Sequence, residues 1–178
     1  MGWGARDLQF AATAPASAGD CTKGKTAGYA RTVDDCTNYV LRMQFRYHEP
    51  YYAGVLLRAV GPDKVWPKAM LADGRKGAMG DLWSLSEFPM KTDPARTKLG
   101  HAVRIGPVGE APADEWNQFE IYLNKGELKL TVNEVLQNTA TDCQEVAGKI
   151  CLPSDGGPVE YRNIVLIPIS SGDEKKKE

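Results

Sequence analysis

The densest group of residues that could carry chemistry lies between Trp66 and Trp83. This stretch holds two tryptophans, the aspartates Asp73 and Asp81, and basic residues that include Lys68. A saccharide site needs flat aromatic rings that stack on the C–H faces of a sugar, together with charged groups that hydrogen-bond its hydroxyls. These residue types therefore favour a sugar site. For each tryptophan taken singly, a place in the core is the alternative.

Carboxylate pairs are the expected machinery for cleaving a glycosidic bond, with one group as proton donor and the other ionised. Asp73 and Asp81 are the candidates for these roles, and a turn-forming role is the alternative for an aspartate in a loop. Arg58 ends an apolar strand and is predicted to line the same groove, with a surface ion pair as the alternative. His48 precedes a turn and is predicted to be an exposed loop residue, not a general base.

Motifs and charge exclude several classes of function. The sequence has no Gly-rich phosphate loop, no GxSxG elbow and no HExxH motif, and it holds only two histidines. We therefore expect no metal and no cofactor, and any catalysis is expected to use carboxylate, Lys, Tyr or Arg side chains. The net charge of −1 gives no preference for nucleic acid. No apolar stretch approaches the roughly 20 residues of a membrane helix, so membrane insertion is not expected.

The elements that must position these residues are β-strands. Short runs with a period of two, separated by turn signals, predict an all-β sandwich or barrel. The clearest run is 39–47, in which Leu41, Met43 and Phe45 should face the core while the arginines and glutamine between them face solvent or the groove. The other predicted strands are 54–60, 68–72, 81–85, 101–105, 116–123, 127–132, 135–139, 148–152 and 159–169.

The length of 178 residues suits one domain. Residues 1–27 are interpreted as an N-terminal arm or edge strand, 28–170 as the sandwich domain and 171–178 as a solvated tail. The proline-containing stretch 86–115 is predicted to be a long functional or covering loop with at most one strand. Only 142–147 has a pattern compatible with a helical turn.

Four cysteines, Cys21, Cys36, Cys143 and Cys151, allow three pairings into two disulfides. Local pairing of Cys21 with Cys36, and of Cys143 with Cys151, is the simplest of the three. Four buried free thiols are the alternative. Oxidised cysteines would place the protein outside the cytoplasm.

Several short motifs follow one another in the order of a known family. They are 28–32 (GYART), 39–47 (YVLRMQFRY), 54–58 (GVLLR), 66–68 (WPK), 80–83 (GDLW), 115–117 (EWN), 132–133 (VN), 148–152 (GKICL) and 161–164 (YRNI). Over about residues 28–169 the chain resembles the 3-keto-disaccharide hydrolase family. Its most specific stretch is the closing Gly-x-Ile-x-Leu followed by Arg-Asn-Ile.

The resemblance implies a two-sheet concanavalin-like jelly-roll sandwich, a secreted or periplasmic bacterial location and a saccharide ligand. It also implies an enzyme acting on glycosides oxidised at the sugar 3-position, by hydrolysis or by elimination with later hydration. A 3-keto group acidifies the adjacent C–H, so a positioned base can start the elimination. Asp81 or Asp73 is the expected acid/base. The residues expected to hold the sugar are Arg58, Lys68, Trp66, Trp83 and Tyr52.

Two stretches depart from the family pattern. Tyr52-Ala53-Gly54 stands where the family usually has Asn-Ser-Gly, and Leu71 and Asp73 stand where it carries Glu and Gln. These changes leave open a second interpretation, a non-catalytic carbohydrate-binding or protein-interaction module on the same fold. Fused or associated domains are compatible with both interpretations.

Overall fold

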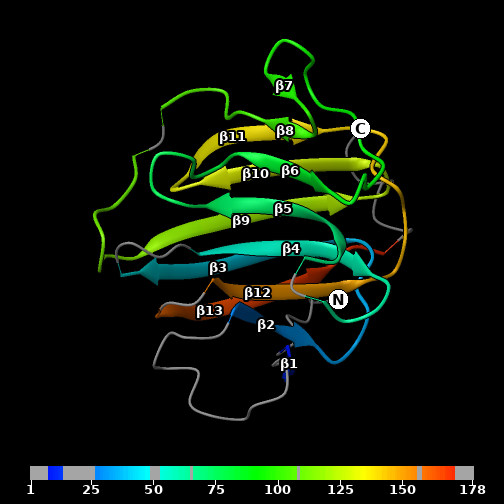
Figure 1. Ribbon diagram of the computed structural model, residues 1–178, viewed down its shortest axis with the longest axis horizontal. Helices are drawn as coiled ribbons and strands as arrows, with labels where there is room; N and C mark the ends of the chain where they lie inside the picture. The colour runs from blue at the N-terminus through cyan, green and yellow to red at the C-terminus, as the bar shows by residue number, and fades with distance from the viewer. Residues whose placement is uncertain are drawn as a thin grey trace.

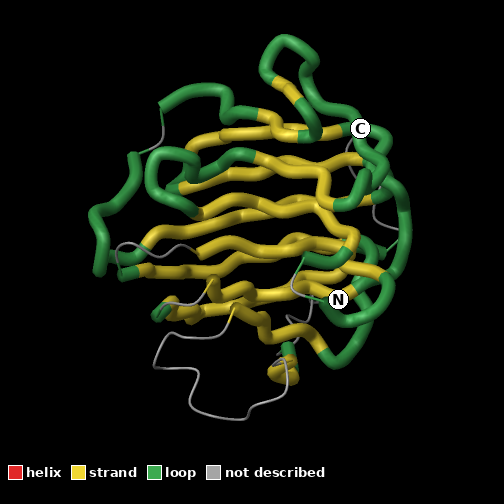
Figure 2. The backbone as a smooth tube through the Cα atoms, viewed as in Figure 1, coloured by secondary structure: helices red, strands yellow, loops and turns green. Residues whose placement is uncertain are grey.

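The computed structural model describes residues 8–13, 27–48, 53–64, 66–107, 109–155 and 158–170. Within these ranges the chain forms β-strands and no α-helix (Figure 2). The strands build two antiparallel sheets that lie one behind the other (Figure 1). The fold is the two-sheet concanavalin-like jelly-roll sandwich expected from the sequence. The predicted tail, 171–178, lies outside the described residues.

The eight-stranded sheet has the order β1-β2-β12-β4-β5-β6-β8-β7, and the five-stranded sheet has the order β11-β10-β9-β3-β13. The strands are β1 (Phe10–Thr13), β2 (Ala27–Thr32), β3 (Tyr39–Tyr47), β4 (Ala53–Val60), β5 (Lys68–Gly74), β6 (Leu82–Leu85), β7 (Thr97–Lys98), β8 (His101–Ala102), β9 (Asn117–Asn124), β10 (Glu127–Val132), β11 (Val135–Ala140), β12 (Lys149–Asp155) and β13 (Val159–Pro168). In the N-terminal region, β1 pairs with β2 at one edge of the larger sheet.

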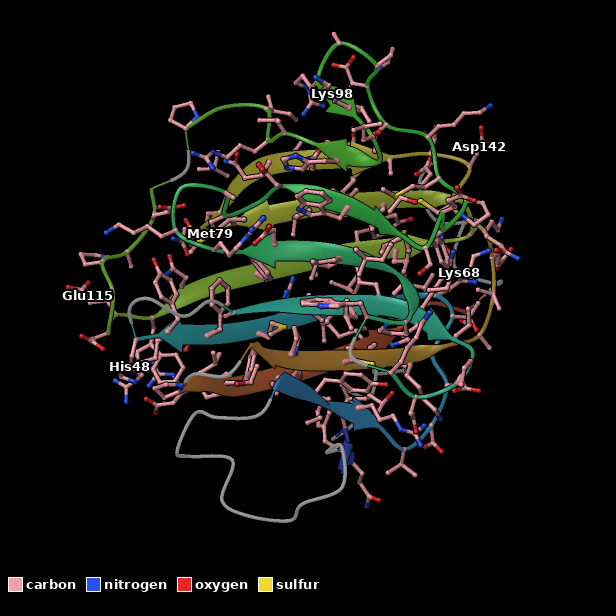
Figure 3. The ribbon with its side chains drawn as sticks, in the orientation of Figure 1. His48, Lys68, Met79, Lys98, Glu115 and Asp142 are labelled. Carbon is pink, nitrogen blue, oxygen red and sulfur yellow. The ribbon has the colours of Figure 1, made fainter. Side chains whose placement is uncertain are left out.

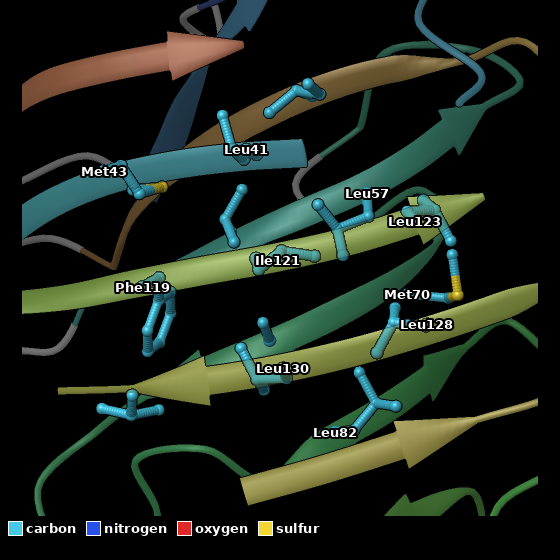
Figure 4. Packing of buried hydrophobic residues seen from close by; sticks show 14 of the residues in the cluster. Leu41, Met43, Leu57, Met70, Leu82, Phe119, Ile121, Leu123, Leu128 and Leu130 are labelled. Carbon is cyan, nitrogen blue, oxygen red and sulfur yellow. The ribbon is translucent and has the colours of Figure 1, made fainter. Parts of the chain in front are cut away.

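The main core lies between the two sheets. In β3 every second residue is buried, including Leu41, Met43 and Phe45, while Arg42 is exposed, so the predicted register is confirmed. A period of two buries one face of a strand and leaves the other in contact with water. The labelled core residues of Figure 4, drawn from both sheets, are Leu41, Met43, Leu57, Met70, Leu82, Phe119, Ile121, Leu123, Leu128 and Leu130.

The centre of the eight-stranded sheet is buried on both faces. β4 and β5 are almost continuously buried, as apolar runs in central strands predict. Val55 and Leu57 belong to the core between the sheets, whereas Leu56 belongs to a second cluster. Alternation therefore puts Leu56 on the face that points away from the five-stranded sheet, which we call the outer face. The second cluster comprises Tyr29, Leu56, Ala59, Ala69, Leu71 and Cys151, with Trp83 and Leu85 packed against it.

The predicted disulfide between Cys143 and Cys151 is wrong, because both thiols are free and buried. Cys143 belongs to the core between the sheets, whereas Cys151 belongs to the outer cluster, so their side chains lie on opposite faces of the larger sheet. Burial raises the pKa of Cys143 to about 11 and that of Cys151 to about 12. Cys36 is also free, and its predicted partner Cys21 lies outside the described residues. The location outside the cytoplasm therefore loses this support and stays a prediction.

Two local predictions are also corrected. Residues 142–147 form no helical turn; the Gln144 N–H donates instead to the Pro89 carbonyl, which ties this segment to a neighbouring loop. The long stretch 86–115 contains the two short strands β7 and β8 and not one strand over 101–105. No helix in the described part of the chain is long and apolar enough to cross a membrane.

Candidate functional site

Polar and aromatic side chains gather on the outer face where β5, β6 and β8 lie side by side. Register pairs Leu71 with Trp83 and Trp83 with His101. Asp73 lies two residues beyond Leu71 and so shares its face of β5. Asp81 immediately precedes β6. We call Asp73, Arg75, Asp81, Trp83 and His101 the Trp83 cluster.

Asp73 is the anchor of this cluster. Only 1% of its side chain is exposed, and its two oxygens accept hydrogen bonds of 2.6–3.1 Å from the Arg75 backbone N–H and guanidinium. Trp83 Nε1 donates to the same carboxylate at 3.1 Å. Backbone hydrogen bonds between Asp73 and both Gly80 and Asp81 close the loop at its base. The charge-assisted pair with Arg75 holds the Asp73 carboxylate in place, and the carboxylate in turn fixes the edge of the Trp83 ring.

His101 is held between a carboxylate and an aromatic ring. Its Nε2 lies 2.7 Å from Asp81 Oδ2, and its ring stacks on Trp83 with centroids 3.9 Å apart and planes 6° apart. Asp81 Oδ1 accepts a second hydrogen bond from the Arg104 N–H at 2.9 Å, and the Asp81 side chain is only 5% exposed. A buried, oriented carboxylate assigns the Nε2–H tautomer to neutral His101, which leaves Nδ1 as the acceptor.

The accessible proton acceptor of the cluster is the imidazole. The His101 side chain is 27% exposed, and Nδ1 has no hydrogen-bond partner among the residues that the structure describes. The arrangement of carboxylate, imidazole and open Nδ1 can take a proton from a molecule that stacks beside Trp83. Within the described ranges, no group of three or more His, Cys, Asp or Glu side chains could hold a metal ion.

Of the residues predicted for the site, Asp73, Asp81 and Trp83 come together, but Arg58 does not. Arg58 is fully buried at a bulge in β4, with a φ of 49°. Its guanidinium donates to five different oxygens: the carbonyls of Thr37, Lys125, Cys143 and Gln144, and Asn38 Oδ1. The prediction that Arg58 lines the groove is therefore wrong. It joins three loops at one end of the sandwich, and burial lowers the pKa of its guanidinium.

Lys68 and Trp66 lie at the far end of β5. Figure 3 shows Lys68 and Met79 at opposite ends of the sheet, and Met79 lies in the connection between β5 and β6, close in the sequence to Asp81. Five strand positions separate Lys68 from Asp73, which is about 17 Å at 3.3 Å per residue. Trp66 is 37% exposed in the connection that precedes β5. Neither residue joins the Trp83 cluster, and Tyr52 lies outside the described residues.

His101 is the member of the candidate site that sequence reasoning missed. The expectation that catalysis would avoid imidazole set both histidines aside. The other, His48, directly follows β3, where 36% of its side chain is exposed and its ring is bonded to Asp114 and Glu160. Nothing near His101 in the sequence signals its role, because Trp83 becomes its neighbour only through strand pairing.

The sequence matches the family model described as the 3-keto-alpha-glucoside-1,2-lyase-like domain over residues 3–167. No curated protein matches it. A Parabacteroides distasonis protein, provisionally assigned as a glycosyl hydrolase, aligns with a TM-score of 0.62 and 15% identity over 81% of this chain and 80% of its own. A Bacillus licheniformis beta-glucanase aligns with a TM-score of 0.60 and 11% identity, over 90% of this chain and 92% of its own. A Bacillus subtilis carbohydrate-binding module aligns with a TM-score of 0.57 and 10% identity, over 92% of this chain and 93% of its own. These likenesses show a shared fold.

Proposed function

Because the chain belongs to the family of 3-keto-alpha-glucoside-1,2-lyase-like domains, we propose that it cleaves the glycosidic bond of a glycoside oxidised at the sugar 3-position. The observation that carries the proposal is the Asp81–His101 pair stacked on Trp83. The imidazole in this pair is the one group of the cluster with an accessible proton acceptor. We also propose a secreted or periplasmic location, which only the family resemblance supports.

The reaction is an elimination between C1 and C2 of the sugar. The carbonyl at C3 acidifies the C2–H bond, and His101 Nδ1 takes that proton. The electron pair of the C2–H bond becomes the C1–C2 double bond while the bond from C1 to the leaving oxygen breaks. The imidazolium then returns its proton to that oxygen, so His101 leaves the step neutral. Water adds to the unsaturated sugar in a later step when the net outcome is hydrolysis.

Asp81 and Asp73 act through other residues in this mechanism. Asp81 positions the imidazole and stabilises the imidazolium, the role of the buried carboxylate in hydrolase triads. Asp73 holds Trp83 through Nε1 and keeps Arg75 beside the ring, 5.9 Å from its centroid. We assign to the Arg75 guanidinium the stabilisation of the negative charge that develops on the keto oxygen. Trp83 supplies a face for the sugar.

This assignment also accounts for Leu71. The residue stands where the family usually carries an acidic group, and it is 6% exposed in the apolar outer cluster. A base that comes from β8 removes the need for a carboxylate at this position in β5.

The experiment is turnover of an aryl 3-keto-glucoside, followed by aglycone release and by absorbance of the unsaturated product. We expect His101→Gln to slow release by about 10²–10⁴-fold, the usual contribution of a general base. The matched control is His48→Gln, because His48 directly follows β3 of the five-stranded sheet and lies outside the Trp83 cluster; this variant should turn over like the parent. Turnover by His101→Gln at the parent's rate would refute the mechanism.

A binding module without turnover is the second candidate function. The burial of Leu71 in the middle of the outer face favours it, because no acidic group faces a ligand there. The same assay separates the two candidates: binding of the keto-glucoside by the parent, with no product on any glycoside, would identify a binding module.

A further inference from the structure

A pocket of about 250 Å³ opens at the other end of the outer face. Its walls come from β2 and the connection that follows it, from the end of β4 and the connection to β5, and from the start of β12 with the residues before it. The residues that give it its character are Tyr29, Arg31, Asp35, Asp63, Pro67 and Lys149. None of these residues belongs to the Trp83 cluster.

Strand pairing places the pocket and the Trp83 cluster on one line across the sheet. The directly paired residues run in the order His101, Trp83, Leu71, Leu56, Cys151, Arg31. Five strand spacings of about 4.8 Å separate the first from the last, about 24 Å in all. Tyr29 and Cys151 belong to the outer cluster and also line the pocket, so the pocket lies on the outer face. A molecule longer than a disaccharide could reach from one end to the other.

The charges of the pocket are paired. Arg31 Nη2 lies 3.2 Å from Asp63 Oδ2, and Lys149 Nζ lies 2.8 Å from Asp35 Oδ1. Two positive and two negative groups cancel, so the pocket has no preference for a charged ligand. Each pair instead offers neighbouring donors and acceptors, which suits the adjacent hydroxyls of a neutral sugar.

Two further features indicate a ligand. Arg31 Nε is buried and has no acceptor among the residues that the structure describes. Buried donors in folded proteins almost always have a partner, so this one calls for an acceptor such as a hydroxyl oxygen. Tyr29 and Pro67 add apolar wall against which a sugar ring can pack.

We propose that this pocket is a second saccharide subsite, which binds a neutral sugar unit of an oligosaccharide remote from the bond that is cleaved. The inference deepens the proposed function and rests on it for the class of substrate. Its consequence is that the protein favours oligosaccharides longer than a disaccharide, because the two ends of one chain then bind together.

The test is a titration of ¹⁵N-labelled protein with neutral gluco-oligosaccharides from disaccharide to hexasaccharide. We expect the amide signals of Tyr29, Arg31 and Lys149 to shift, and the longer chains to bind more tightly. Arg31→Gln should weaken binding of the hexasaccharide by about tenfold or more, the effect of losing a charged hydrogen-bond donor. Tyr29→Phe removes only the hydroxyl that donates to Asp63 and provides a second variant if the first is poorly folded.

The matched control is Arg42→Gln, because Arg42 also lies on a strand and pairs with a carboxylate, Glu120, but on the other sheet. Its binding should equal the parent's. Equal binding by Arg31→Gln and the parent, or shifts confined to the Trp83 cluster, would overturn the subsite. Product from a 3-keto-glycoside without shifts at the pocket would leave the proposed cleavage standing alone. Shifts at the pocket without product would leave the subsite standing and overturn the cleavage.

Discussion

Replacement of Arg58 by methionine tests whether this residue serves the fold or a ligand. Methionine keeps the apolar stem of the side chain but removes every donor of the guanidinium. Four of the acceptors, on Thr37, Asn38, Lys125 and Gln144, lie within 2.7–3.2 Å of Arg58 nitrogens. At about 1 kcal/mol for each acceptor the loss is about 4 kcal/mol. Relief from burying the charge reduces this, and we expect a net destabilisation of about 3 kcal/mol.

The assay is urea unfolding followed by tryptophan fluorescence, with the free energy of unfolding obtained by linear extrapolation. Arg42→Met is the control, because its ion pair with Glu120 is exposed and should contribute less than about 1 kcal/mol. Arg58→Lys keeps the charge without the planar fork and should lie between the parent and Arg58→Met. An Arg58→Met protein that unfolds like the parent but no longer binds saccharide would show that Arg58 is a ligand residue and that this account of its role is wrong.

Two other outcomes follow from the geometry. Asp81→Asn should lower turnover by about 10²-fold or more, because the amide no longer fixes the tautomer of His101. The dependence of the rate on pH should change as well, and an unchanged pH–rate profile would show that Asp81 does not position His101. Cys143 and Cys151 should resist alkylation at pH 8 until the protein is unfolded, since burial raises their pKa values to about 11 and 12 from an ordinary value of 9.0. Alkylation of Cys143 and Cys151 in the native protein at pH 8 would contradict their burial. Ionisation of these thiols favours the unfolded state, so the free energy of unfolding should fall as the pH rises from 9 towards 12.

The half-buried strands were predictable because each shows its buried face in the sequence. The predicted bounds of β3 and β10 match the structure, since hydrophobic and polar residues alternate along both. The end of β5 was predicted too early. Asp73-Gly74 is a turn signal in the sequence, yet both residues belong to the strand, because Arg75 and Trp83 satisfy the carboxylate. Partners that lie elsewhere in the chain cannot be found from the local pattern.

The candidate site was predictable only in part, for a related reason. Asp73, Asp81 and Trp83 lie close together in the sequence, so composition alone marked them. His101 joins them through the pairing of β6 with β8, which depends on how the connection between them folds. Arg58 was misplaced because a charged residue at the end of an apolar strand suggests exposure. A bulge with positive φ turns it inward, towards carbonyls that no sequence pattern reveals.

The outer face has an apolar middle that packs and two polar ends that are free to bind, and this arrangement bears on catalysis. Its middle, at Leu56, Leu71 and Cys151, is apolar and buried, so polar groups able to meet a sugar lie at the two ends. In the proposed mechanism His101 acts on a C–H bond at one end, and the proposed subsite around Arg31 holds a sugar that does not react at the other. Binding energy gained far from the reacting bond can position that bond against the base. Since no acidic group lies in the middle of the outer face, we expect the turnover rate of this domain to depend on the length of its substrate.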